Sequence, residues 1–373
     1  MARKKIGYPV KLAAIALVVA ATFGMKSFSD DENRPAIPSI TPAMVDSMTV
    51  LPGGLGALPA VPVPADNPQT KAKIELGKRL FFDTRMSGDF SSSCATCHNP
   101  SLAFTDGLPR ARGFGGKTLP RNSPTVLNAA YNTAQFWDGR AATLDEQCKG
   151  PLLSAAEMNM VDEKHLLSRL NAVPQYRRDF RKAFGSEPSL DNVTHAIATF
   201  ERTLVTPDSR FDRYARGDKK ALTDQEKRGL IVFFGKGSCS ECHSGPNFTD
   251  NKYHNLGAKP VPGNPQDLGR FAVTHDPKDM GAFKTPTLRN VTLTAPYMHD
   301  GSVATLGEVV DFYNRGGDGA PNQDKLIFKL NLTAQDKKDL IAFLKSLTGT
   351  IPQVKPPKMY SANHPQADGG QGQ

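Results

Sequence analysis

The sequence predicts a mainly α-helical protein with two domains that are related by internal duplication. Amphipathic segments at helical spacing recur along the chain, whereas strand-like alternation is scarce. Two long stretches also repeat at a constant offset. The chain has 373 residues, which is more than one hydrophobic core usually organises, so two domains of ordinary size are expected.

The helices are predicted from apolar residues that recur every three or four positions. Two such segments, 71–83 and 226–234, each lie shortly before a pair of cysteines. Four further segments have the same periodicity, namely 162–170, 191–204, 305–313 and 334–347.

The duplication is visible as matching windows. Residues 124–144 repeat as 286–306, at an offset of 162, the difference between 286 and 124. The cysteine pairs repeat at an offset of 145, from 94 to 239, and each is followed by Phe-Thr-Asp. Each half therefore contains one copy of the same unit.

The ends of the chain differ in composition from the rest. Residues 1–30 combine early basic residues with an apolar run, which predicts an export signal or an uncleaved membrane anchor, and therefore a periplasmic location. Residues 31–67, rich in proline and glycine, predict an extended arm, and 351–373 a disordered tail. The two domains are expected at 68–215 and 216–350, with the boundary between 207 and 223.

Two pentapeptides of the form C-x-x-C-H carry the chemistry. They are Cys94-Ala95-Thr96-Cys97-His98 and Cys239-Ser240-Glu241-Cys242-His243. In this motif the thiols add to the haem vinyl groups and the adjacent histidine ligates the iron. Zinc knuckles are the alternative, but histidine in both copies favours two covalently bound haems c, with His98 and His243 as proximal ligands.

The offset of 162 distinguishes the two irons. It pairs Tyr313 with Pro151, so a residue that can ligate iron stands where the other half has one that cannot. We therefore expect the first haem to be open and the second to be closed by Tyr313, with Met280 and Met298 as rival ligands.

An open haem needs groups that move protons between the peroxide oxygens. Glu157 is the candidate acid and base, and Gln147 the candidate neutral donor, although both could be ordinary surface residues. Trp137, the only tryptophan, is expected to conduct electrons between the haems, although tryptophan is more often a core residue. Cys148 is expected to be a buried, inert thiol.

Over residues 68–348 the chain resembles the bacterial dihaem cytochrome c peroxidases, and within them the MauG-type enzymes. Both haem motifs carry this resemblance, together with the segments 135–140, 286–290 and 295–301. It implies a catalytic N-terminal haem, an electron-transfer C-terminal haem, and Trp137 between them. The absence of a histidine between His98 and Trp137, and the presence of Tyr313, match the MauG-type branch, as do Gln147, Pro151 and Glu157.

The resemblance also implies a calcium ion, with Asn122, Thr294 and Pro296 at the matching positions, the last two through backbone carbonyls. The chain departs from MauG itself just before the second motif. There Gly237 replaces a surface tryptophan that relays oxidation to a partner.

Taken together, these features predict a periplasmic peroxidase that reduces hydrogen peroxide with electrons from a small cytochrome c or cupredoxin. A MauG-like enzyme that oxidises side chains of a partner protein is the second hypothesis. A dihaem electron carrier without catalysis is the third. The formal net charge of +9 indicates acidic partners, and the haem propionates offset part of it; nucleic acid is not expected to bind.

Overall fold

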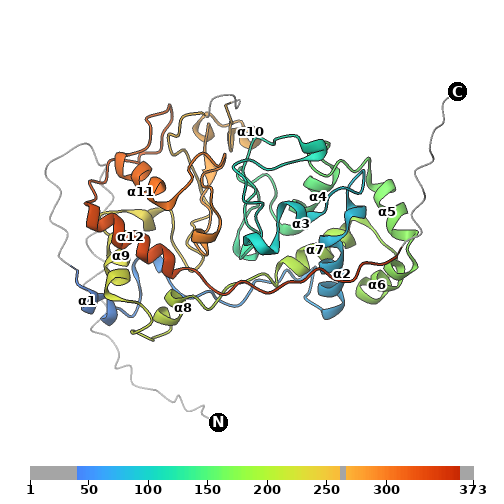
Figure 1. Ribbon diagram of the computed structural model, residues 1–373, viewed down its shortest axis with the longest axis horizontal. Coiled ribbons are helices and arrows are strands. Elements are labelled where there is room, and N and C mark those ends of the chain that lie inside the picture. Colours follow the sequence, from blue (N-terminus) through green and yellow to red (C-terminus); the bar gives the residue numbers. More distant parts are fainter. Residues whose placement is uncertain (1–39, 261–265, 362–373) are drawn as a thin grey trace, which may run out of the picture. The chain divides into compact units, whose positions relative to one another are not determined.

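The computed structural model describes residues 40–260 and 266–361 (Figure 1). The predicted signal or anchor at 1–30 lies outside these residues. Within the described ranges, no helix has the length and apolar composition needed to cross a bilayer.

The described chain is mainly helical, as predicted. Its α-helices are α1 (Pro42–Ser47), α2 (Lys71–Phe82), α3 (Cys94–Cys97), α4 (Leu144–Leu153), α5 (Glu163–Asn171), α6 (Pro174–Phe184), α7 (Leu190–Glu201), α8 (Arg210–Ala215), α9 (Asp224–Phe234), α10 (Phe271–Thr274), α11 (Leu306–Arg315) and α12 (Ala334–Ser346). Two short strands, β1 (Tyr253–His254) and β2 (Phe283–Lys284), pair antiparallel.

The six helices predicted from periodicity are confirmed as α2, α5, α7, α9, α11 and α12. Among the longer helices, the prediction missed α4, with 10 residues, and α6, with 11 residues. Helix α4 contains Pro151, which sequence propensity reads as a helix breaker. Its first turn is stabilised by Thr143, whose hydroxyl accepts a hydrogen bond from the Glu146 amide.

Cys94 and Ala95 of the N-terminal cysteine motif pack against the first hydrophobic cluster. Helices α2 and α7 cross closely because Gly77 has no side chain: a Cβ there would lie 1.8 Å from the carbonyl oxygen of Ala196. Phe81 packs against Phe200 and Phe104, with ring centroids 5.3 and 6.4 Å apart. This packing fixes the loop after the first motif, because Phe104 belongs to that loop.

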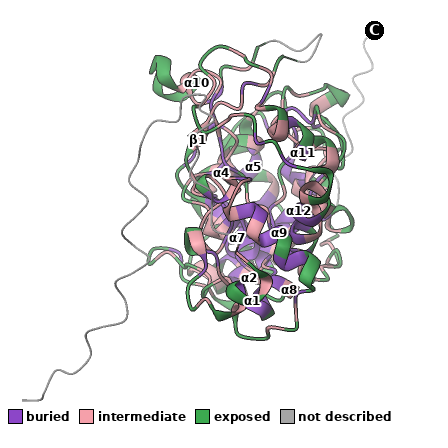
Figure 2. Ribbon diagram, turned by 90° about the vertical axis from the view of Figure 1, so that its left-hand side faces the viewer, coloured by how far each residue is buried: buried purple, intermediate pink, exposed green. Residues whose placement is uncertain are grey.

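The second hydrophobic cluster repeats this design. Helices α9 and α12 cross at Gly229, where a Cβ would lie 2.0 Å from the carbonyl oxygen of Asp339. Phe233, Phe248 and Phe343 form an aromatic group in this cluster. The buried faces of α2, α7, α9 and α12 appear in purple in Figure 2.

The duplication is preserved in three dimensions at the offset of 162. Helix α4 begins at Leu144 and α11 at Leu306, and both have ten residues. The bridge between Gln135 and Ala141 recurs between Tyr297 and Val303. The repeated windows therefore fold alike.

Residues 40–67 differ from the extended arm that composition predicts. Thr41 caps α1, and Val45, Leu51 and Leu55 are buried in the second cluster. Apolar residues spaced between the prolines thus attach this segment to the C-terminal half.

The tail prediction is wrong for residues 351–361. Ile351, Val354 and Tyr360 pack against the N-terminal cluster. The Tyr360 ring lies edge-on to Tyr176, with centroids 5.1 Å apart, and the Arg79 guanidinium lies 4.1 Å above it. One aromatic side chain thus anchors a segment whose composition otherwise suggests disorder.

The core changes from the first cluster to the second between Leu204 and Phe211. Phe211 and Tyr214 of α8 belong to the C-terminal cluster, although the predicted N-terminal domain includes them. The domain boundary at 215/216 remains a prediction.

Candidate active site

The first cysteine motif lies on the short helix α3 and the residue after it. The Thr96 hydroxyl accepts a hydrogen bond from the Ser93 amide at 3.0 Å, which orders the start of this turn. The Nδ1–H of His98 donates to the carbonyl oxygen of Phe104 at 3.3 Å. This hydrogen bond fixes the tautomer and leaves Nε2 available to a metal, as in most metal-binding histidines.

The second motif repeats this arrangement. His243 Nδ1–H donates to the carbonyl oxygen of Phe248 at 3.0 Å, and burial lowers the pKa of His243 to about 4. Phe104 and Phe248 both adopt a left-handed backbone conformation, with φ of 57° and 53°. A neutral imidazole with a free Nε2 is the form that ligates iron.

A cavity of about 590 Å³ adjoins the second motif. This volume lies within the usual range for cofactor sites, about 300 to 1,000 Å³. Its lining includes Cys239, Cys242 and His243 on one element and Tyr313, Leu340 and Leu344 on others. Two thiols, a free imidazole nitrogen and apolar walls around one cavity fit a haem.

Tyr313 reaches this cavity from α11. Burial raises the pKa of its phenol well above the ordinary value, and the nearby thiols of Cys242 and Cys239 add to the shift. Its hydroxyl forms no hydrogen bond with any residue in the described ranges. A half-buried phenol that lines the cavity beside the cysteine motif and has no hydrogen-bond partner among the described residues is suited to ligate a metal.

The two rival ligands lie on the same cavity. Met280 and Met298 both belong to its lining, together with Tyr313. This cavity is therefore lined by three side chains that can ligate iron.

Trp137 connects the two halves. Its indole Nε1–H donates to the carbonyl oxygen of Asn122 at 3.0 Å. Its own carbonyl accepts from the amide of Lys284 at 2.7 Å. Trp137 also lines the cavity. Trp137 is therefore hydrogen-bonded to Asn122 in the N-terminal half and to Lys284 in the C-terminal half.

An ion-pair network surrounds this contact. The Arg121 guanidinium bonds Asp138 at 2.6 Å within the first half and Asp267 at 2.6 Å in the second. Arg270 donates to the carbonyl oxygens of Asp138 and Gly139, both at 2.9 Å. These charge-assisted bonds fix the backbone on either side of the indole.

The three predicted calcium positions lie on one cavity. Asn122, Thr294 and Pro296 all line it. The Asn122 side-chain NH₂ donates to Leu108 O at 2.8 Å, so its oxygen is oriented away from that bond. Oxygen donors of this type suit a hard cation.

The two residues predicted for the distal side of the first haem are Glu157 and Gln147. Burial raises the pKa of the Glu157 carboxyl, while Arg140 acts in the opposite direction. Glu157 also raises the pKa of Cys97, after burial and Asp106, which places it near the first motif. Gln147 is half-buried on α4, where its backbone N–H donates to the Thr143 carbonyl oxygen. No hydrogen bond joins its side chain to Glu157 among the described residues.

Cys148 is buried in the N-terminal cluster. Burial raises the pKa of its thiol well above the ordinary value, and Glu201 and Cys94 add to the shift. A thiol that stays protonated is a poor nucleophile, as expected for an inert cysteine.

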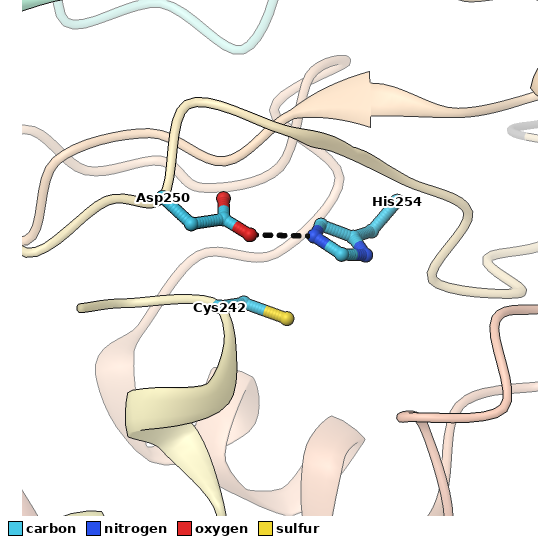
Figure 3. Close-up of side chains that lie close together, drawn as sticks. All are labelled: Cys242, Asp250 and His254. Atoms are coloured by element: carbon cyan, nitrogen blue, oxygen red, sulfur yellow. Dashed lines mark hydrogen bonds and ion pairs between the residues drawn. The ribbon is translucent and has the colours of Figure 1, made fainter. Parts of the chain in front are cut away.

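His254, which belongs to neither cysteine motif, lies at the site (Figure 3). Its Nδ1 donates to Asp324 at 2.6 Å and its Nε2 to Asp250 at 3.1 Å. The nearby Cys242 sulfur first, and then the carboxylates of Asp324 and Asp250, raise the pKa of His254 to about 10. The position of His254 four residues after Asp250 of the second Phe-Thr-Asp was the available signal.

The ligand atoms of Cys242, Asp250 and His254 lie within 4.8 Å of one another, which is close enough for a metal ion. An imidazole that donates from both nitrogens is protonated, however, and cannot ligate. The motif also assigns Cys242 to the haem. We therefore interpret the ion pairs of His254 with Asp250 and Asp324 as contacts that stabilise the backbone beside the second cysteine motif.

Comparison with known proteins is consistent with this geometry. The family model described as di-haem cytochrome c peroxidase matches residues 71–220. The methylamine utilization protein MauG of Methylorubrum extorquens is 45% identical over 302 residues, covering 79% of this chain and 85% of that protein. The cytochrome c551 peroxidase of Nitrosomonas europaea is 42% identical over 315 residues, covering 82% and 89%.

Among solved structures, the chain is similar to a MauG-like protein associated with microbial copper homeostasis. The TM-score is 0.73 at 38% identity, with 79% of this chain and 94% of that one covered. The chain belongs to the di-haem cytochrome c peroxidase family, which includes MauG, and is an oxidoreductase that acts on peroxide.

Proposed function

We propose that this protein binds two haems c and reduces hydrogen peroxide to water with electrons from a small cytochrome c or cupredoxin. Cys94 and Cys97 attach the first haem, and Cys239 and Cys242 the second, through thioether bonds. His98 and His243 are the proximal ligands. Their Nδ1–H groups, bonded to the carbonyls of Phe104 and Phe248, keep each Nε2 directed to iron.

One observation carries the assignment of roles to the two haems. Pro151 and Tyr313 occupy the same position on the duplicated helices α4 and α11. Tyr313 closes the second site, whereas Pro151 has no atom that can ligate. The first haem therefore keeps a position for peroxide, and the second transfers electrons.

The bound haem iron supplies the position that takes peroxide and accepts its two oxidising equivalents. Glu157 moves the proton: its carboxylate takes a proton from the near oxygen of peroxide and returns it to the departing oxygen. Gln147 donates a hydrogen bond and adds no charge. Two electrons and two protons complete the conversion of one peroxide into two water molecules.

Trp137 is proposed to conduct between the haems, because it is bonded to Asn122 in one half and to Lys284 in the other. A calcium ion held by Asn122, Thr294 and Pro296 would lie at the same wall of the cavity. Its charge and coordination would fix this contact between the halves.

A MauG-like enzyme that oxidises side chains of a partner protein is the second candidate. It is supported by the position of Tyr313 on the cavity and by the 45% identity to a MauG. Gly237, which replaces the relay tryptophan, favours the peroxidase. A dihaem carrier without catalysis would need a ligand at the position of Pro151.

The two candidates are separated by the source of the electrons. The purified protein is given hydrogen peroxide and reduced cytochrome c or cupredoxin, and oxidation of the donor is followed by absorption. In parallel, proteins co-expressed with it in the periplasm are examined by mass spectrometry. Catalytic donor oxidation supports the peroxidase. A peroxide-dependent loss of hydrogen mass or gain of oxygen in a partner, without donor turnover, supports the MauG-like enzyme.

A further inference from the structure

Lys284 is a buried cation at the cavity wall. Lys284 is the second residue of β2, and only 7% of its surface is exposed. It lines the cavity together with Cys242 and His243. Lysine is seldom buried to this degree unless its ammonium group is paired.

Lys284 has no such pair within the described residues. Its Nζ donates one hydrogen bond, to the carbonyl oxygen of the adjacent Thr285, at 3.4 Å. Burial lowers the pKa of Lys284 to about 8, and Asp250 only partly opposes that shift. Since an unpaired buried charge is costly, an anion that enters the cavity would be strongly favoured.

Hydrogen bonds on both sides of Lys284 fix its backbone at the cavity. Lys284 pairs with Tyr253 across the two-stranded sheet, and its amide donates to Trp137 O at 2.7 Å. The amide of Thr285 bonds to Lys252 O at 2.9 Å. The side chain of Lys284 thus extends from a backbone that hydrogen bonds hold in place.

The duplication makes this cation specific to the second half. At the offset of 162, Lys284 corresponds to Asn122, which is neutral. The first half has no lysine at this position, so the feature is not a requirement of the repeated fold.

We propose that Lys284 binds a propionate of the C-terminal haem and, through the hydrogen bond from its backbone N–H to the Trp137 carbonyl oxygen, positions that haem against the inter-haem tryptophan. A carboxylate is the anion that a haem would bring into this cavity, and a charge-assisted bond would satisfy both groups. Removal of the cation would favour the more positive ferric state, so the midpoint potential of this haem would fall. The inference rests on the proposed attachment of haem at Cys239 and Cys242.

The test uses the full-length holoprotein and three readouts other than turnover. Lys284→Gln and Lys284→Met remove the charge, Lys284→Arg retains it, and Lys252→Met removes an exposed lysine next to β1 as the matched control. Haem content is measured by the pyridine haemochrome assay. Propionate bonding is measured by the propionate bending bands in resonance Raman spectra, and the potential of each haem by spectroelectrochemistry.

We expect Lys284→Gln and Lys284→Met to shift one propionate band and to lower the potential of the C-terminal haem only. Lys284→Arg should retain most of the wild-type propionate band position and haem potential. Lys252→Met should change neither the band nor the potential. Wild-type bands and potentials in Lys284→Gln would overturn the inference while leaving the proposed function intact. A wild-type protein with fewer than two haems would instead refute the proposed function. If Lys284→Met does not bind haem, the comparison of propionate bands and potentials between Lys284→Gln and Lys284→Arg tests the inference.

Discussion

Pro151 and Tyr313 are each the third residue from the end of equivalent ten-residue helices, α4 and α11. One copy of the repeated fold therefore presents a phenol, and the other a ring that cannot ligate. The phenol of Tyr313 is half-buried and lies near Cys242 and Cys239. This pair of residues distinguishes the two haem sites more directly than either cysteine motif does, because the motifs are alike.

Tyr313→Phe should remove the sixth ligand of the C-terminal haem and leave the N-terminal haem unchanged. The loss of an anionic ligand destabilises ferric iron, so the potential of that haem should rise. Electron paramagnetic resonance and spectroelectrochemistry of the ferric protein would detect both changes.

Met280→Leu and Met298→Leu are the matched tests of the rival ligands, because both side chains line the same cavity. Neither should alter the spectrum of the C-terminal haem. A low-spin signal that survives Tyr313→Phe but is lost in one methionine variant would assign the ligand to that methionine.

Glu157→Gln should lower the second-order rate constant for the reaction with peroxide by about 10²-fold or more, the usual contribution of a positioned acid–base group. Burial raises the pKa of the Glu157 carboxyl. The carboxylate form is the one that takes the proton from peroxide. The wild-type rate should therefore fall as pH falls through this raised pKa, and the Gln variant should lack that fall. Stopped-flow rates across pH give both quantities.

Glu163→Gln is the control for this experiment, because Glu163 is an exposed glutamate six residues away, at the start of α5. It should leave the rate and its pH dependence unchanged. If both substitutions lowered the rate constant equally, the negative charge of Glu157, and not proton transfer by its carboxylate, would account for its effect.

Arg289→Met should strongly destabilise the C-terminal half. The ion pair between Arg289 and Asp212 is fully buried at 2.9 Å, and the same guanidinium donates to Pro246 O and Gly56 O. Breaking a buried pair by removing one partner costs about 3 to 5 kcal/mol. Urea denaturation would measure the loss. Asp212→Asn in the Arg289→Met background should recover part of it, and purely additive losses would contradict the pairing.

Tyr360→Ala should destabilise the N-terminal half by about 1 to 2 kcal/mol, although Tyr360 is close to the C-terminus. The ring packs on Tyr176 and under Arg79, and the Tyr360 carbonyl accepts from Arg85 at 3.0 Å. Thermal unfolding measures the change, with the exposed Lys355→Ala as the control. An unchanged unfolding temperature would mean that residues 351–361 do not stabilise this half in solution.

The sequence predicted the features that depend on local pattern. Apolar periodicity located α2, α7, α9 and α12, and the offset of 162 predicted that Pro151 and Tyr313 are equivalent. Helix α4 escaped because its interior contains a glycine and a proline, and the packing of its buried residues Leu144, Cys148 and Leu152 compensates for their low helix propensity.

Features that depend on long-range contacts could not be predicted. The tail at 351–361 has a disordered composition, but Tyr360 finds a site formed by residues about 180 to 280 positions earlier. His254 and Lys284 belong to no motif. Their importance arises only when β1 and β2 pair beside the second cysteine motif.

The central claim is that the N-terminal haem is open in the fully oxidised protein. Its most direct test is stopped-flow absorption of the purified ferric protein mixed with stoichiometric hydrogen peroxide, with no prior reduction. The account predicts a prompt spectral change that involves both haems, because Trp137 connects the two sites. A protein that reacts only after one haem has been reduced would contradict it, since another ligand would then close the site next to Pro151.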